Sequence, residues 1–137
     1  MIAGNVPVLV HNCGTEDFAH GTTLEHGQNI ISNGLDEGAS RANLFGSKSP
    51  GSFYTVPVDQ ADTQAAIDTA AGWGSRQGGQ TCVIVCRLPN NLVSDLEQEG
   101  LLVRTDVPSQ AIFHPGAFPR INEAVANGTA QWFGPIT

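Results

Sequence analysis

The chain has 137 residues, which favours a single domain because domains average roughly 150 residues. Its 6 basic and 13 acidic side chains give a net charge of −7, so the basic face that binds nucleic acid or an anionic membrane surface is not expected. Charged residues make up 14% of the chain, beside 16 Gly and 8 Pro, which excludes a coiled coil or a charged helical bundle. The 40% of hydrophobic residues is enough for a packed core.

The first twelve residues carry no charge, and the composition changes after them. A turn at Gly4–Asn5 and alternate valines predict a short strand that ends at His11. On spacing alone, one interpretation of this segment is an ordinary N-terminal strand. The order Gly-Asn-Val-Pro-Val-Leu-Val-His-Asn-Cys resembles the closing block of HINT autoproteolytic domains, found in the pretoxin modules of bacterial polymorphic toxins. In that family the asparagine cyclises with help from the preceding histidine. The resemblance implies a break at Asn12–Cys13, with residues 1–12 as the HINT remnant and residues 13–137 as its cargo.

Hydrophobic periodicity and turn residues predict the elements of the cargo. Strands are predicted at Phe18–Thr22, Phe53–Val56, Thr81–Leu88, Leu101–Thr105, Ala111–Phe113 and Thr129–Phe133. Helices are predicted from Leu24 to a stop at Gly34, from an N-cap at Asp59 to about Trp73, and over Asn91–Glu99 and Arg120–Asn127. The Gly- and Ser-rich segment Asp36–Ser52 is predicted as a long loop. The pattern is that of an α+β domain with more strands than helices.

The three cysteines, Cys13, Cys82 and Cys86, are too few for a disulfide framework and lack the spacing of zinc ligands. We expect Cys82 and Cys86 to be small core residues in a reducing compartment. No histidine pair stands at metal-ligand spacing, so no metal is implied. No apolar run reaches the ~18 residues of a membrane span, and the start lacks the charged region of a signal peptide.

Two short motifs stand where a predicted strand is followed by a helix. The first is His20-Gly21-Thr22 and the second contains Tyr54. A glycine beside a histidine leaves backbone that another group can approach closely, and a tyrosine offers a flat ring with a hydroxyl. Taken singly, each has a simpler interpretation: a structural histidine, a turn glycine and an edge-strand tyrosine.

Together and in this order, the motifs resemble the ADP-ribosyltransferase fold in its His-Tyr-Glu branch, the diphtheria-toxin and poly(ADP-ribose)-polymerase group. The resemblance implies a split mixed β-sheet with short flanking helices, and NAD as co-substrate bound by His20, Gly21, Thr22 and Tyr54. In that family the histidine binds the ribose on the adenosine side. The glycine backbone pairs with the nicotinamide carboxamide, and the tyrosine stacks on the nicotinamide ring. Catalysis would consist mainly of positioning and electrostatic stabilisation of an oxocarbenium-like ribose.

The third residue of that family is a glutamate on a later strand, but the best-matching position here is Gln110. A glutamine can hydrogen-bond the ribose 2′-hydroxyl, yet it brings no negative charge. Three alternatives stay open: Gln110 is the working third residue, Glu123 or Asp106 supplies the carboxylate, or the pocket does not bind NAD. His114 either packs at the strand end or lines the pocket.

The expected function is that of the C-terminal toxin domain of a secreted polymorphic toxin, which uses NAD to ADP-ribosylate a macromolecule in competitor cells and releases nicotinamide. The alternatives are an NAD glycohydrolase toxin and a non-catalytic binding module with a degraded NAD pocket. The resemblance also implies secretion within a larger toxin, action in the target-cell cytoplasm and a cognate immunity protein. The acidic composition favours a protein acceptor over nucleic acid, and no membrane or metal partner is expected.

Overall fold

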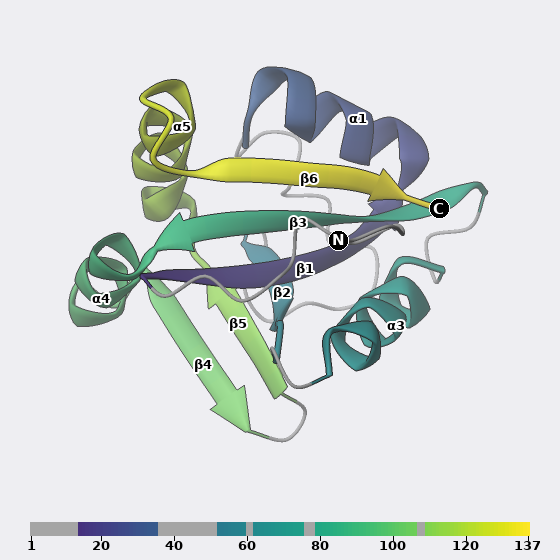
Figure 1. Cartoon of the computed structure of the whole chain (residues 1–137), viewed down its shortest axis with the longest axis horizontal. Helices are drawn as coiled ribbons and strands as arrows, with labels where there is room; N and C mark the ends of the chain where they lie inside the picture. The colour runs from purple at the N-terminus through teal and green to yellow at the C-terminus, as the bar shows by residue number, and fades with distance from the viewer. Residues whose placement is uncertain (1–13, 36–51, 60–61, 76–78, 107–108) are drawn as a thin grey trace, which may run out of the picture.

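Six strands form one sheet in the order β4-β5-β2-β1-β3-β6 (Figure 1). The computed structural model describes residues 14–35, 52–59, 62–75, 79–106 and 109–137. The strands are β1 (Thr15–Thr23), β2 (Phe53–Pro57), β3 (Thr81–Pro89), β4 (Leu102–Asp106), β5 (Ser109–Phe113) and β6 (Gln131–Ile136). The helices are α1 (Leu24–Asn33), α3 (Thr63–Gly74), α4 (Asn90–Gln98) and α5 (Phe118–Ala126), with a 3-10 turn η3 (Pro115–Ala117). The described part is therefore α+β, as the sequence predicts.

Every strand pairing within the described residues is antiparallel. The mixed sheet implied by the family resemblance is therefore wrong for this part of the chain. The reason is the strand order. Strands β2 and β3 run in the same direction and are connected through α3, but β1 lies between them, so this crossover produces no parallel pair.

The sheet is narrowly joined between β1 and β2. These strands share two register pairs, Phe18↔Pro57 and Ala19↔Val56, whereas β1 pairs with β3 along all nine of its residues. Figure 1 shows β6, β3 and β1 running side by side across the view while β2, β5 and β4 descend steeply from them. The sheet thus consists of two three-stranded halves that part beyond Ala19.

Alternation along the strands gives the sheet two faces with separate cores. The Phe18 face carries Phe18, Phe53 and Phe113 and is covered by α1, α4 and α5. The Ala19 face carries Ala19 and Val56 and is covered by α3, which packs on β1, β3 and part of β2.

The ends of α1 are fixed by side chains and by a glycine. Thr23 Oγ1 accepts a hydrogen bond from the His26 amide at 3.2 Å, which satisfies a free N–H of the first turn. At the other end Gly34 adopts φ 87°, so the predicted stop is confirmed. Asn122 of α5 then holds the chain at Leu35, accepting from its N–H at 2.9 Å and donating to its carbonyl at 3.0 Å.

The predicted start of α3 is three residues too early. Asp62 is the N-cap, with its carboxylate accepting from the Ala65 amide, while Asp59 forms a turn with Asp62 ahead of the helix. Both aspartates suit a cap, and the alanine-rich periodicity does not distinguish between them. The predicted break at Asn12–Cys13 and nearly all of the predicted loop Asp36–Ser52 lie outside the described residues.

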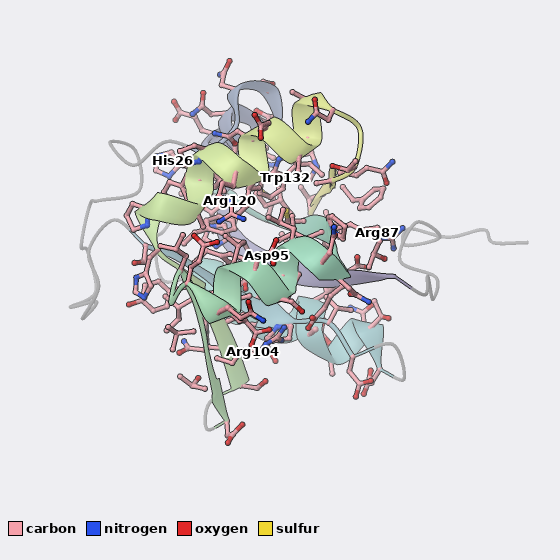
Figure 2. The ribbon with its side chains drawn as sticks, turned by 90° about the vertical axis from the view of Figure 1, so that its left-hand side faces the viewer. His26, Arg87, Asp95, Arg104, Arg120 and Trp132 are labelled. Carbon is pink, nitrogen blue, oxygen red and sulfur yellow. The ribbon has the colours of Figure 1, made fainter. Side chains whose placement is uncertain are left out.

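All three arginines in the described residues are ion-paired, while the same residues contain eleven carboxylates. Arg104 reaches Glu16 at 2.7 Å, and Figure 2 shows Arg120 close to Asp95 between α5 and α4. The third pair, Arg87 with Asp17, is buried in the sheet. The described surface is accordingly acidic, because its positive charges are already neutralised.

Candidate functional site

The strand order brings the three predicted catalytic residues onto neighbouring strands. His20 lies on β1, Tyr54 on β2 and Gln110 on β5, and these strands stand in the order β5-β2-β1. The His20 ring and the backbone carbonyl of Tyr54 meet at the point where the two half-sheets part. The sequence placed these residues 34 and 56 positions apart, so their proximity is a product of the topology.

The side chain of His20 on β1 bonds to β2 beside the short β1–β2 pairing, which is the join between the half-sheets. Its Nδ1 lies 2.7 Å from the carbonyl oxygen of Tyr54, and its ring lies against that of Phe53 with centroids 4.1 Å apart. A carbonyl only accepts hydrogen bonds, so Nδ1 carries the proton and Nε2 is left as an acceptor. His20 is therefore suited to accept a hydrogen bond from a hydroxyl group.

Burial lowers the pKa of His20 from 6.5 to about 4, against the opposing effect of its hydrogen bond to the Tyr54 carbonyl. The imidazole is therefore neutral at neutral pH. Because the unfolded chain takes up a proton near pH 6.5 and the folded chain does so only near pH 4, protonation favours the unfolded state between these values.

We expect the free energy of unfolding to fall by about 3 kcal/mol as the pH drops through this window, a loss that His20→Asn removes. Urea unfolding at a series of pH values measures it. Gln98→Ala, at an exposed position on α4, is the control and keeps the wild-type profile. An unchanged pH dependence in His20→Asn would contradict the assignment.

Gly21 points its backbone groups into the gap between β1 and β2. The Asp17 carbonyl accepts from the Val58 amide and Ala19 pairs with Val56, so alternate residues of β1 face β2 and Gly21 is the next of them. Within the described residues the register of β1 with β2 does not continue to a Gly21–Tyr54 pair. The Gly21 amide and carbonyl are therefore directed toward the β2 side of β1.

The absence of a side chain at Gly21 has a different cause from the one that the sequence suggested. A Cβ at this position would collide with the carbonyl of Ala70 in α3, and one at Gly74 would lie 2.8 Å from the carbonyl carbon of Gly21. The group that approaches Gly21 closely is thus a helix of the same chain. Thr22 is also occupied structurally: it is 3% exposed and its methyl packs beneath Gly27 of α1.

Tyr54 and Gln110 project from the same face of the sheet. Phe53 pairs with Phe113 on the Phe18 face, so Tyr54 and its partner Ile112 lie on the Ala19 face, as does Gln110 two residues from Ile112. Diagonal neighbours of this kind are about 7–8 Å apart, within reach of long and aromatic side chains. Both residues are half-buried, which leaves part of each side chain accessible.

The two alternative carboxylates lie away from the join. Asp106 ends β4, where it is exposed and pairs with Ser109 of β5, and both β5 and β2 lie between β4 and β1. Glu123 is exposed on α5, which covers the Phe18 face. Of the three candidates for the third residue, Gln110 is the one on the strand next to Tyr54.

His114 has a partner that the sequence did not predict. Its Nδ1 lies 3.0 Å from the hydroxyl oxygen of Ser52, which is 8% exposed. The two residues stand opposite each other just beyond the Phe53↔Phe113 pair. They lie on the same face of the sheet as Tyr54. Only the pairing of β2 with β5 reveals this contact, since 62 residues separate the two in sequence.

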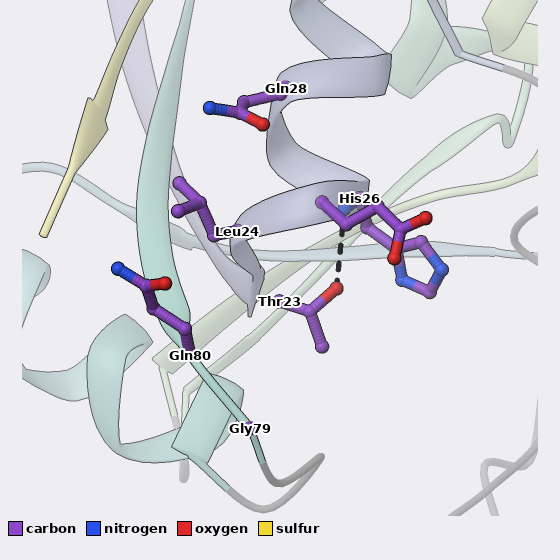
Figure 3. Close-up of a pocket in the computed structure, with 7 residues that line it drawn as sticks. Thr23, Leu24, His26, Gln28, Gly79 and Gln80 are labelled. Atoms are coloured by element: carbon purple, nitrogen blue, oxygen red, sulfur yellow. Dashed lines mark hydrogen bonds between the residues drawn. The ribbon is translucent and has the colours of Figure 1, made fainter.

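A hollow of about 480 Å³ opens where β1 ends and α1 begins. Figure 3 shows its lining of Thr23, Leu24, His26, Gln28, Gly79 and Gln80, with the Thr23 cap bond at its rim. Its polar side chains are amides, an imidazole, a hydroxyl and the carboxylate of Glu25. Its lining contains no lysine or arginine. A second hollow, of about 290 Å³, lies between α4 and α5 and includes Glu123.

The described residues contain no cluster of three or more histidine, cysteine or carboxylate groups able to hold a metal ion. In the same ranges, none of the helices has the length and apolar character required to cross a bilayer. Cys82 and Cys86 are buried and free, and burial raises the pKa of both thiols, which confirms them as core residues. No family model, curated protein or solved structure matches this chain.

Proposed function

We propose that residues 13–137 form an NAD-dependent ADP-ribosyltransferase toxin domain that transfers ADP-ribose to a protein of a competitor cell. The observation that carries the proposal is the meeting of His20 with Tyr54 at the parting of the half-sheets, with Gln110 on the next strand. The three residues come from neighbouring strands, with the His20 ring packed against Phe53 on the Phe18 face and the side chains of Tyr54 and Gln110 on the Ala19 face. The break at Asn12–Cys13, release from a larger secreted toxin and a cognate immunity protein belong to the same proposal.

Each group has a role that its geometry suits. The free Nε2 of His20 accepts a hydrogen bond from a ribose hydroxyl, because Nδ1 is held by the Tyr54 carbonyl. The Gly21 amide and carbonyl are a donor and acceptor pair that matches the carboxamide of nicotinamide. Tyr54 supplies the ring that stacks on the nicotinamide. The hollow at the start of α1 adjoins β1 three residues beyond His20, where its amides suit the adenosine half.

Gln110 changes how the positive charge on the ribose is stabilised. Its amide oxygen accepts a hydrogen bond from the 2′-hydroxyl but provides a dipole where a glutamate provides a full charge. Catalysis therefore depends on orientation of the glycosidic bond and on the hydrogen-bond network. Gln110→Glu would add the charge, and we expect it to retain NAD binding.

The test is transfer of labelled ADP-ribose from NAD to proteins of a target-cell lysate, with free nicotinamide measured in parallel. We expect His20→Ala and Tyr54→Ala each to reduce transfer by at least about 100-fold. Gln98→Ala is the control, at an exposed position of α4 away from the join and from the hollow, and should keep wild-type transfer. Equal urea midpoints show that the variants fold.

Three outcomes distinguish the alternatives. Nicotinamide release without labelled protein identifies a glycohydrolase. Absence of NAD binding by calorimetry, together with tight binding of a partner protein, identifies a non-catalytic module. Full transfer by both His20→Ala and Tyr54→Ala would show that the reaction occurs elsewhere in the chain.

A further inference from the structure

On the Ala19 face, β5, β4 and the Tyr54 end of β2 form a partly exposed, uncharged surface, while Val56 of β2 is buried beneath α3. The register places Val103, Ile112 and Tyr54 in one row across the three strands, with Thr105 and Gln110 in the next. Val103 is 41% exposed, and Tyr54, Ile112 and Gln110 are half-buried. The charged residues of these three strands are Arg104 and Asp106. Arg104 covers the Phe18 ring, and Asp106, two residues further along β4, points to the same Phe18 face.

His114 is the titratable imidazole at the border of this surface. It lies diagonally across from Tyr54, on the opposite side of Ile112 from Gln110, and its Nδ1 is held by buried Ser52. A hydrogen bond from Nδ1–H to the Ser52 hydroxyl leaves Nε2 free to take a proton. This is the arrangement of a general base held in position by a second group. Gln110 has no basic atom and cannot serve in this way.

We propose that His114, positioned by Ser52, is the general base that deprotonates the acceptor, and that the acceptor is a hydroxyl side chain of a protein. The inference rests on the proposed function. A neutral hydroxyl fits a surface without fixed charge, whereas a guanidinium acceptor would need a carboxylate partner there.

The hydroxyl oxygen of the acceptor forms a bond to C1′ of the ribose as the bond from C1′ to the nicotinamide nitrogen breaks. The electron pair of that bond neutralises the pyridinium, and nicotinamide leaves uncharged. The hydroxyl proton passes to Nε2 of His114 and then to water. The products are the O-linked ADP-ribosyl protein, nicotinamide and one proton.

The experiment compares His114→Ala, His114→Gln and Ser52→Ala with the wild-type chain. Calorimetry measures NAD affinity, and labelled NAD with target-cell lysate gives kcat and KM for transfer. We expect both His114 variants to lower kcat by at least about 100-fold while KM for NAD stays within about threefold. Ser52→Ala lowers kcat less, because the imidazole remains. Mass spectrometry should locate the modification on serine, threonine or tyrosine.

Each negative result would contradict a different part of the proposal. If the wild-type chain neither binds NAD nor releases nicotinamide, the proposed function itself is wrong. If the wild type transfers ADP-ribose and His114→Gln transfers it equally well, only the role of His114 is wrong. A rise in KM for NAD that accounts for the whole loss would show a structural role, and modification of arginine would overturn the hydroxyl acceptor.

Discussion

Replacing Asp17 by alanine is expected to lower the free energy of unfolding by about 3–5 kcal/mol, because it leaves the Arg87 guanidinium buried without its counter-ion. The two residues are cross-strand partners on β1 and β3, and the carboxylate receives two hydrogen bonds, at 2.7 Å from Nε and 2.9 Å from Nη2. Asp17 is 1% exposed, so water does not replace the lost partner. Urea unfolding, with the midpoint and slope recorded, measures the loss.

Two further variants separate this effect from a general loss of acidic charge. Asp106→Ala removes an exposed carboxylate from the end of β4 and should change the free energy of unfolding by less than about 0.5 kcal/mol. The double variant Asp17→Leu with Arg87→Met removes both charges and should recover much of the stability. A single-variant loss below about 1 kcal/mol would show that water reaches Arg87.

Gly21→Ala is expected to destabilise the protein by about 3 kcal/mol or more, at or above the upper end of ordinary overpacking. The added methyl would overlap the Ala70 carbonyl, a backbone atom that moves only if α3 moves. Gly74→Ala meets the same contact from the other side, 2.7 Å from the Thr22 amide nitrogen, and should act in the same direction. Both losses appear as lower urea midpoints.

Gly72 provides a control two residues away on the same helix. A Cβ at this position meets nothing within 4 Å, so Gly72→Ala should stabilise α3 by about 0.5–1 kcal/mol through helix propensity alone. Opposite signs at Gly72 and Gly74 are the expected signature of close packing between α3 and β1. Similar effects at both positions would contradict it.

The sequence predicted the elements well where a physical pattern was strong. The continuous apolar run beginning at Thr81 is the nine-residue strand β3, and Gly34 ends α1 as a glycine at positive φ. It was less informative where two similar residues competed, as at the cap of α3, and where the outcome depended on topology. Whether the sheet is mixed or antiparallel depends on β1 lying between β2 and β3, which periodicity does not encode.

The candidate site was predicted as residue types rather than as contacts. The motifs singled out His20, Tyr54 and Gln110, yet the bond from His20 to the Tyr54 carbonyl depends on where β1 and β2 part. Thr22 belonged to the same motif, but side chains alternate between the two faces of β1, and that of Thr22 is buried beneath α1. Ser52 carried no signal, because its partner is brought to it only by the pairing of β2 with β5.

The narrow join between β1 and β2 has a consequence for how the domain would respond to a ligand. Two register pairs and the His20 bond couple the half-sheets, so each half is expected to open to solvent with some independence of the other. A molecule bound across the join contacts both halves and links their opening. Its binding would then slow amide hydrogen exchange throughout β3 and β5, strands on opposite sides of the join, and not only at the residues it touches.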